Sequence, residues 1–382
     1  MDPQPLVSII INNYNYGSFV GQAIDSALNQ TYKKFEIIVV DDGSTDHSRE
    51  VISAYGEKII CVLKENGGQA SAINAGFKQS KGSIILFLDA DDYLSTRAVE
   101  AFVEKFDRDK IVKAHWPLWR VDVKGKKTGK YFPEEILSEG DLREQVIKYG
   151  PAHSGGPPHS PPASGNAWAR SFLEKVMPVP EAEFRGGVDN YLFVLAPVYG
   201  EIRSISEPLG YYRVHGTNNT LKADYMTTFF SRFEYCCNAL SHHLLNTGMK
   251  KDPTDWPRDH WYHKVFHAMN DIASVIPSQE SFLLVDENLW LTGDNVIDRK
   301  RIYFPERNGE YWGIPSGDDE AIGELKRHQL KGIKYIVLAW TSFWWLDHFK
   351  TFGAYLLSNY NCVLKNERTM IYEKKDDNSK ME

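Results

Sequence analysis

Residues 83–92 read Ser-Ile-Ile-Leu-Phe-Leu-Asp-Ala-Asp-Asp, an unbroken apolar run that ends in three acids. A short continuous apolar run is typical of a strand buried on both faces of a parallel sheet. Similar runs precede it at 7–11, 35–40 and 58–63. Amphipathic helical patterns separate all four runs, so the first hundred residues predict a doubly wound, mostly parallel α/β sheet.

Polar side chains follow three of these runs, at the points where the strands should end. The clusters occupy residues 12–16, 41–44 and 89–92. In open parallel sheets, ligands bind beyond the carboxyl ends of the strands. The sequence therefore places a ligand site at this edge of the sheet before any chemistry is assigned.

The acids after residue 88 carry the strongest chemical signal. In an extended backbone, Asp89 and Asp91 point to the same side. Clustered carboxylates repel one another unless a cation or hydrogen-bond donors neutralise them. Mg²⁺ or Mn²⁺ held by one or two carboxylates, with diphosphate oxygens completing the shell, is one solution. The alternative is a helix N-cap, with Asp91 or Asp92 capping a helix that starts near Ser95.

Composition excludes several classes of protein. The formal net charge is −7 and no Lys/Arg-rich block occurs, which argues against a broad nucleic-acid interface. No apolar run reaches the length of a membrane span, and no signal-peptide pattern is present. The four cysteines lack paired spacing, which favours free thiols in a reducing compartment. We expect a cytoplasmic protein, with peripheral membrane association left open.

The chain after residue 100 is expected to form further parts. Residues 151–165 are rich in Pro, Gly, Ser and His and predict an irregular segment, either a linker or a substrate lid. We expect a catalytic domain over 1–222, a helical linker over 223–276, a small α/β accessory domain over 277–375 and a polar tail over 376–382. The accessory domain is predicted from two short apolar strands, a capped helix and a closing hairpin.

Four segments in register carry a family resemblance: VSIIINNYN, FEIIVVDDGSTD, ENGGQASAINAGF and FLDADD. They resemble glycosyltransferase family 2, whose catalytic domain has the GT-A fold. The likeness resumes more loosely through SGNAWARSFL, GGVDNYLF and EPLGYYRVHGTNN. It implies a nucleotide-sugar donor, a divalent metal and transfer with inversion.

The resemblance also implies roles for residues near the strand ends. Tyr14 would stack on the nucleobase, and Asp42 would accept a hydrogen bond from its imide nitrogen, as expected for uridine. Asp91 would ligate the metal, and Asp89 would contact the ribose or the sugar. Asn12 stands where the family often has a small polar residue. Packing of Tyr14 within its loop is the alternative for that residue.

The catalytic base is expected in the second half of the chain. Displacement at an anomeric carbon needs a carboxylate to take the proton of the acceptor hydroxyl. Asp189 matches the family position, where relatives often have an acidic pair. Here it stands alone, with Glu181 and Glu183 upstream. Asp189 can also serve as a helix cap, and the two roles are compatible.

Other side chains have open interpretations. His215 is a candidate third metal or diphosphate contact, or a hydrogen-bonded structural histidine. Arg213 is a candidate diphosphate contact, because guanidinium matches phosphate geometry. His260, His263 and His267 share one helix face, which favours packing or solvation over a metal site. Residues 343–346 read Phe-Trp-Trp-Leu, either a sugar-binding platform or core of the small domain.

The sequence thus predicts an inverting, non-processive glycosyltransferase that uses a UDP-sugar and Mg²⁺ or Mn²⁺. The acceptor is a glycan, a lipid-linked glycan or a small molecule. Non-processive transfer is inferred because the chain lacks the Gln-x-x-Arg-Trp signature and the membrane helices of polymerising synthases. The alternatives are a nucleotidyltransferase and a catalytically inactive nucleotide-sugar-binding module. An Asn- and Tyr-rich first loop, where nucleotidyltransferases usually have a Gly-rich basic loop, argues against the former.

Overall fold

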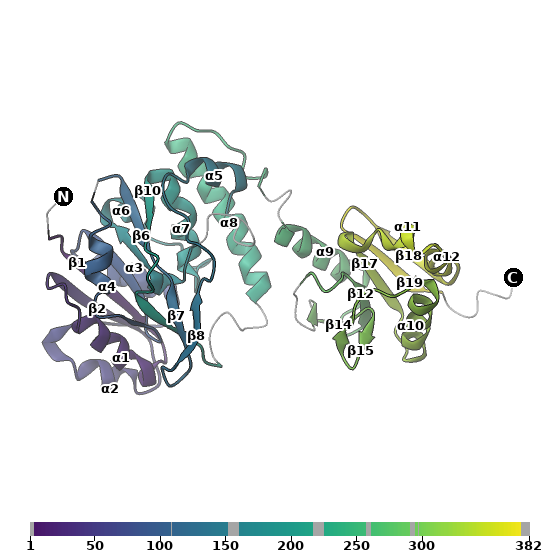
Figure 1. The fold of residues 1–382 in the computed structure, drawn as a ribbon, viewed down its shortest axis with the longest axis horizontal. Helices are drawn as coiled ribbons and strands as arrows, with labels where there is room; N and C mark the ends of the chain where they lie inside the picture. The colour runs from purple at the N-terminus through teal and green to yellow at the C-terminus, as the bar shows by residue number, and fades with distance from the viewer. Residues whose placement is uncertain are drawn as a thin grey trace. The chain divides into compact units, whose positions relative to one another are not determined.

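The structure is a computed structural model that describes residues 4–107, 109–151, 160–216, 225–256, 261–290, 295–296 and 298–375. The chain divides into two compact units, Met1–Pro257 and Arg258–Glu382 (Figure 1). Each unit has its own sheet and its own hydrophobic core, so they are described separately.

The first unit is built on a seven-stranded sheet with the order β10-β6-β9-β4-β1-β2-β3. Its strands are β1 (Val7–Asn13), β2 (Phe35–Asp42), β3 (Ile60–Lys64), β4 (Ile84–Asp89), β6 (Ile111–His115), β9 (Asn166–Ala169) and β10 (Glu201–Ser204). Strands β1 to β4 run parallel, as the apolar runs predict, and β9 is antiparallel to both of its neighbours. This confirms the mostly parallel α/β class.

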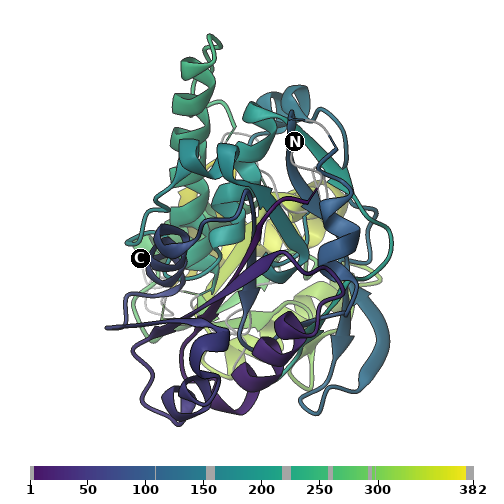
Figure 2. The same ribbon diagram turned by 90° about the vertical axis from the view of Figure 1, so that its left-hand side faces the viewer.

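Three helices connect the first four strands: α1 (Gly17–Leu28), α2 (Ser48–Ser53) and α3 (Gln69–Gln79). The strand order steps outward from β1 to β3 and then returns to β4. Right-handed crossovers therefore put α1 and α2 on one face and α3 on the other. Figure 2 shows α1 and α2 together in purple at the foot of the first unit. Helix α3 packs closely on the sheet at Gly76, where an added Cβ would lie 2.4 Å from Ile10.

A second sheet of four strands, β5-β11-β7-β8, lies in the same unit. The strands are β5 (Tyr93–Leu94), β7 (Leu118–Val121), β8 (Lys127–Phe132) and β11 (Gly210–Arg213). Strand β11 pairs antiparallel with β5, with Tyr211 opposite Tyr93. This pairing brings the segment after residue 211 beside the acidic turn that precedes β5.

The remaining elements of the first unit cover the sheet and the loops. They are α4 (Ala98–Val103), α5 (Arg143–Tyr149), α6 (Arg170–Val176), α7 (Val188–Tyr199), α8 (Tyr225–Asn246) and the short 3₁₀ turns Gly56–Lys58 and Ala163–Gly165. Helix α7 is almost wholly buried, which matches its apolar sequence. Helix α8 contributes Phe233, Cys237 and Leu240 to the core of this unit.

The second unit has a six-stranded sheet with the order β13-β14-β12-β17-β19-β18, and a small two-stranded sheet. Its strands are β12 (Ser281–Val285), β13 (Asn295–Val296), β14 (Arg299–Tyr303), β15 (Glu306–Arg307), β16 (Glu310–Tyr311), β17 (Tyr335–Ala339), β18 (Tyr360–Lys365) and β19 (Thr369–Lys374). The helices are α9 (Trp261–Val275), α10 (Asp318–Leu330), α11 (Trp345–His348) and α12 (Lys350–Asn359), with a 3₁₀ turn at Trp340–Ser342. Two apolar clusters form its core.

The boundary between the units differs from the predicted one. The expected linker over 223–276 is divided, because α8 packs in the first core while α9 packs in the second. On α9, Val265, Ala268 and Ile272 lie against the second sheet's apolar residues. The second unit therefore begins near residue 258 instead of 277. Among the described residues, no helix is long and apolar enough to cross a membrane.

Two further predictions concern the second unit. Trp345 is fully buried, whereas Trp344 is 38% exposed and donates its Nε1 hydrogen to Glu287 Oε1 at 2.6 Å. The Trp pair therefore contributes one core residue and one surface residue. On α9 the Nε2 atoms of His263 and His267 lie 3.0 Å apart, and His260 falls outside the described residues.

Candidate active site

The carboxyl ends of β1, β2 and β4 bring the predicted polar clusters together. The register places Asn12 opposite Asp89 and Asn13 opposite Asp41. Asn13 is buried, and its amide donates to Asp41 Oδ1 at 3.0 Å and to Ser44 Oγ at 3.1 Å. The edge of the sheet is thus a connected polar surface, as the strand pattern predicts.

Asp89 ends β4 and accepts two side-chain hydrogen bonds. Asn12 Nδ2 and Gln69 Nε2 each donate to its Oδ1 at 2.9 Å. Burial raises the pKa of Asp89 to about 7. The negative charges of Asp91 and Asp189 raise this pKa as well, and the hydrogen bond from Asn12 lowers it. Such a group is poised to meet a hydroxyl or a cation.

Asp91 and His215 form a close pair. Their Oδ2 and Nε2 atoms lie 2.9 Å apart, and both side chains are largely buried. The pairing of β11 with β5 delivers the histidine to this position. The rings of Tyr16 and Phe19, at 5.5 and 5.3 Å, surround the imidazole. A carboxylate and an imidazole that converge in this way suit a divalent transition metal.

Asp92 and Arg213 hold the acidic turn. Asp92 accepts from Ser164 Oγ at 2.7 Å and from the Arg213 backbone N–H at 3.0 Å. The guanidinium of Arg213 donates to the carbonyl oxygens of Asp91 and Val123 and to Gln22 Oε1. It is 2% exposed. The expected diphosphate role for Arg213 is therefore replaced by a structural one, because its donors already bind acceptors of the protein.

The Asp42 carboxylate already has hydrogen-bond partners within the protein, which the sequence did not predict. Its carboxylate accepts four hydrogen bonds, from Lys64 Nζ, Asn66 Nδ2 and the backbone N–H groups of Gly67 and Gly68, at 2.7 to 3.1 Å. A nucleobase N–H would have to replace one of these donors. Lys64 and Asn66 are the two side-chain donors of this set, and Asn66 is the more exposed of the two.

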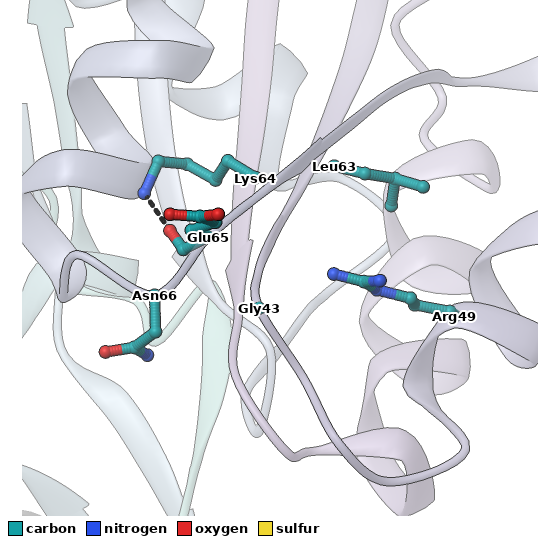
Figure 3. Close-up of a pocket in the computed structure, with 6 residues that line it drawn as sticks. All are labelled: Gly43, Arg49, Leu63, Lys64, Glu65 and Asn66. Atoms are coloured by element: carbon teal, nitrogen blue, oxygen red, sulfur yellow. Dashed lines mark hydrogen bonds between the residues drawn. The ribbon is translucent and has the colours of Figure 1, made fainter.

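An open pocket of about 470 Å³ lies beside Asp42. It is lined by residues of the loops that follow β2 and β3, namely Gly43, Arg49, Leu63, Lys64, Glu65 and Asn66 (Figure 3). Figure 3 shows the Lys64 ammonium turned back onto the Glu65 carbonyl, at 2.6 Å. Tyr14, the predicted stacking residue, is 45% exposed, so its ring is available for contact.

Asp189 lies in the first turn of α7 and is half-buried. Burial raises the pKa of its carboxyl, although its own backbone N–H, Lys113, Arg232 and the backbone N–H of Asn190 oppose the rise. Gly187 holds the N-cap position with a left-handed φ of 71°. Gly187, and not Asp189, is therefore the N-cap, and no side chain caps this helix, so the cap interpretation of Asp189 is wrong. Asp189 remains a candidate base. Glu181, the upstream alternative, is exposed and bonded to Asn74.

Gln69 connects the two halves of the site. Its Nε2 donates to Asp89, and its Oε1 accepts from the Val188 backbone N–H at 3.3 Å. Backbone bonds from Gln69 and Ala70 to Arg185 and Phe184 reinforce the link. One side chain therefore fixes the acidic turn relative to the helix that carries Asp189.

Three residues near the site, Gln69, Tyr16 and Lys113, were not predicted from the sequence. Gln69 lies in the ENGGQASAINAGF segment, and the resemblance of that segment to the family was the signal that could have pointed to this residue. Tyr16 lies among the acids, and its pKa is raised by burial and by Asp91, Asp89 and Asp92.

Of the segment 151–165, residues 152–159 fall outside the described residues, so its predicted lid or linker role stays a prediction.

Comparisons with known proteins agree with this geometry. The family model described as Glycosyl transferase family 2 matches residues 8–160. The chondroitin synthase of Pasteurella multocida is 46% identical over 111 residues, which cover 28% of this chain and 12% of the synthase. S. aureus TarS 1-349, crystallised with UDP-GlcNAc, aligns with a TM-score of 0.50 and 18% identity, covering 71% of this chain and 76% of that TarS fragment. At that identity the likeness shows the fold alone.

A match over a longer stretch of the chain decides the family. An uncharacterized glycosyltransferase of Nostoc sp. is 36% identical over 221 residues, which cover 57% of this chain and 67% of the relative. The residues matched by the family model include the ends of the strands that carry the polar clusters. The chain therefore belongs to glycosyltransferase family 2 and is a glycosyltransferase.

Proposed function

We propose that the protein transfers one sugar from a UDP-sugar to an acceptor hydroxyl, with inversion and with the help of a divalent cation. One observation carries the proposal: Gln69 bridges Asp89 to the start of α7, so the acidic turn and Asp189 belong to one rigid assembly. A donor-binding edge and a proton acceptor are the two parts that direct displacement needs.

The donor is assigned to the carboxyl edge of the sheet. The pocket beside Asp42 is open and large enough for a nucleobase, and Tyr14 offers an exposed ring. A uridine imide N–H would replace Lys64 or Asn66 as a donor to Asp42. Asn12 Oδ1 is buried without a donor among the described residues, and a ribose hydroxyl would satisfy it. TarS, which binds UDP-GlcNAc, supports a UDP-linked donor.

The metal is assigned to Asp91 and His215. Their ligand atoms, 2.9 Å apart, are close enough to share one ion, and oxygen with imidazole nitrogen suits Mn²⁺ and is compatible with Mg²⁺. When bound, the cation would act as a Lewis acid that stabilises charge on the departing diphosphate. Arg213 is not included, because its donors are engaged by the turn.

The transfer step is assigned to Asp189. The acceptor oxygen attacks the anomeric carbon and its proton passes to the Asp189 carboxylate, while the bond from that carbon to the diphosphate oxygen breaks and UDP leaves. One bond forms on the face opposite the bond that breaks, which inverts the configuration.

A panel of UDP-sugars tests the proposal. Each donor is incubated with the protein and Mn²⁺ or Mg²⁺, and free UDP is measured with and without candidate acceptor glycans. We expect one donor to give metal-dependent UDP release, to raise the melting temperature, and to yield the inverted anomer by NMR. Binding without release would instead favour an inactive nucleotide-sugar-binding module, and release of pyrophosphate from a nucleoside triphosphate would favour nucleotidyl transfer.

The second unit is proposed to be an accessory domain that positions the acceptor. Every residue assigned to bond making precedes residue 216, and the second unit has its own sheet and core. A chain ending at Pro257 should remain folded and hydrolyse the donor within about threefold of the full chain, while transfer to the true acceptor falls. Loss of donor hydrolysis would show that the second unit belongs to the catalytic fold.

A further inference from the structure

The four-stranded sheet of the first unit carries aromatic side chains in a line. Tyr93 on β5 pairs with Tyr211 on β11. Trp119 on β7 pairs with Tyr211 on one side and with Tyr131 of β8 on the other. Residues paired across neighbouring strands project from the same side of a sheet. Each of the four strands therefore contributes one ring to an aromatic row that crosses the sheet.

The rings of the aromatic row lie close to one another. Tyr93 and Tyr211 stack, with ring centroids 4.3 Å apart and planes inclined by 11°. Trp119 meets Tyr131 edge-on at 6.1 Å. Between these two pairs, Lys127 Nζ lies 4.2 Å from the Trp119 ring and 5.4 Å from the Tyr211 ring. With neighbouring strands about 4.8 Å apart, the row extends over roughly 14 Å.

The face that carries the aromatic row lies outside the core of the unit. Among the side chains that the structure describes, the core includes Leu94 and Leu118, from the opposite face of the sheet, and none of the four rings. Three of the rings are half-buried, and Tyr131 is 42% exposed. Accessible aromatic patches with polar groups beside them mark binding surfaces. Packing of the core therefore does not explain the row.

The aromatic row begins beside the proposed metal pair. Tyr93 follows Asp91 by two positions, and Tyr211 precedes His215 by four. The Asp91 and His215 side chains are 2.9 Å apart. From β5 the row continues across the sheet to β8, the strand at its other edge. A chain-like ligand whose reacting end lies at the acidic turn can therefore extend along the row.

Lysines border the aromatic row. Lys124, Lys126 and Lys127 are exposed, in the turn before β8 and at its first residue. The Tyr93 hydroxyl donates to the Gly125 carbonyl at 3.3 Å, which holds this turn beside the row. Within the described part of the chain, none of the three ammonium groups is paired with a carboxylate. In a chain with a net charge of −7, this local excess of cations favours an anionic ligand.

We propose that the aromatic row binds an acidic glycan, with pyranose faces on the rings and carboxylate groups on the lysines. The spacing of neighbouring rings is close to the length of one pyranose unit. A lipid chain fits less well, because the Lys127 ammonium stands between the rings and each tyrosine carries a hydroxyl. That this glycan is the acceptor rests on the proposed transfer. The site lies in the first unit and adds to the role proposed for the second.

Calorimetry on the full chain, without donor or metal, tests glycan binding. The acidic probes are hexagalacturonic acid and a hexasaccharide of alternating glucuronic acid and N-acetylglucosamine, and each is compared with its carboxyl-reduced form. We expect at least one acidic probe to bind, and its neutral form to bind about tenfold more weakly. Binding of the acidic form should weaken between about 50 and about 300 mM NaCl, because salt screens exposed charges. Phosphatidylglycerol vesicles are tested in parallel.

Two adjacent residues of β8 provide a matched pair of variants. Tyr131 and Phe132 are both 42% exposed, but Phe132 projects from the opposite face, where its ring lies 5.7 Å from Tyr212. Tyr131→Ser should weaken binding of the acidic probe about tenfold, and Phe132→Ser should leave it within about twofold. If the transfer reaction is observed, Tyr131→Ser should raise the KM for the glycan more than it lowers kcat.

A second pair of variants tests the charge. Lys127→Gln should weaken binding about threefold and reduce its dependence on salt. Lys130→Gln is the control, because Lys130 projects from the opposite face of β8 and pairs with Glu134 at 3.4 Å. It should leave binding unchanged. Melting temperatures are measured for all four variants, and the Lys127 pair decides the test if Tyr131→Ser fails to fold.

Each outcome bears on one proposal. Failure of both acidic probes to bind would overturn the glycan site, and so would equal binding by Tyr131→Ser and Phe132→Ser. Binding to the vesicles alone would assign the surface to a membrane and overturn it as well. If an acidic glycan binds through Tyr131 while no donor releases UDP, the transfer proposal fails and the glycan site stands. If UDP is released and neither acidic probe binds, only the inference about the row fails.

Discussion

The two units both end parallel strands in acids, but they use those acids differently. In the first unit, Asp89 is bonded by Asn12 and Gln69, which lie 77 and 20 positions away in the chain. In the second unit, Asp286 follows β12 and accepts from the backbone N–H groups of Asn288 and Trp290, two and four positions away. A carboxylate bonded within its own turn stabilises a loop. Carboxylates that converge from distant segments form a site.

The largest expected effect is at Asp189. Asp189→Asn removes the proton acceptor, so transfer should fall by about 10² to 10⁴-fold, while donor binding, measured by calorimetry, stays within a few-fold. Glu181→Gln is the control, because that exposed side chain lies outside the assembly, and its activity should stay within about threefold. The opposite ranking of the two variants would move the base to Glu181.

The difference in stability between Asp189→Asn and the wild type should depend on pH. Burial raises the pKa of Asp189 in the folded state, so the wild type loses stability as pH rises from the unfolded pKa through the folded one. Asn stays neutral throughout. Asp189→Asn should therefore unfold like the wild type near pH 4 and become relatively more stable toward pH 7, as measured by urea denaturation.

The next effect is at the metal pair. Asp91→Asn removes a ligand charge and should reduce UDP release by about 10² to 10³-fold, because a Lewis acid contributes several kcal/mol. The rise in melting temperature on adding Mn²⁺ should also disappear. Asp92→Asn is the control, since Asp92 is buried against Ser164 and the Arg213 backbone. It should keep the Mn²⁺ shift. A normal Mn²⁺ shift in Asp91→Asn would remove Asp91 from the metal site.

A smaller effect tests the bridge itself. Gln69→Ala removes the link between Asp89 and the start of α7, and misplacement of catalytic groups typically costs up to about 10²-fold. We expect kcat to fall by about 10 to 10²-fold with little change in donor affinity. Gln79→Ala, at the exposed end of the same helix, should be neutral. Equal kinetics for the two variants would mean that α7 is positioned without Gln69.

The smallest effect on activity is expected in the second unit. Asp286→Ala leaves two backbone N–H groups without their acceptor, which should lower the free energy of unfolding of that unit by about 1–2 kcal/mol. Donor hydrolysis should not change. Asp347→Ala, at an exposed position on α11, should alter neither quantity. A loss of donor hydrolysis in Asp286→Ala would show that this acid also belongs to a site.

Much of the catalytic sheet was predictable because it depends on local signals. Apolar runs gave β1, β2 and β4, and the acids that follow them marked the site. The pairing of Asp91 with His215 was not predicted, since it depends on β11 meeting β5. In the second unit, the helix expected for the small domain is α10, Asp318–Leu330.

The remaining features depend on contacts that no local pattern encodes. Arg213 matches phosphate chemistry in sequence, yet its donors are used by the carbonyl groups of Asp91 and Val123, which lie 122 and 90 residues earlier. Asp42 looks free in its motif, yet the ENGG segment saturates it. The end of the first unit was misplaced because α8 and α9 are both amphipathic, and only packing assigns each to a core.

The antiparallel strand β9 has a consequence for synthesis of the chain. It lies between β4 and β6, so neither β6 nor β10 can join β4 until residues 166–169 have left the ribosome. Until then the edge of β4 presents unpaired backbone groups, the kind of edge on which nascent chains aggregate. The segment 8–160 that matches the family model ends just before this strand. Expressed alone, this segment would lack β9 and would leave that edge of β4 open.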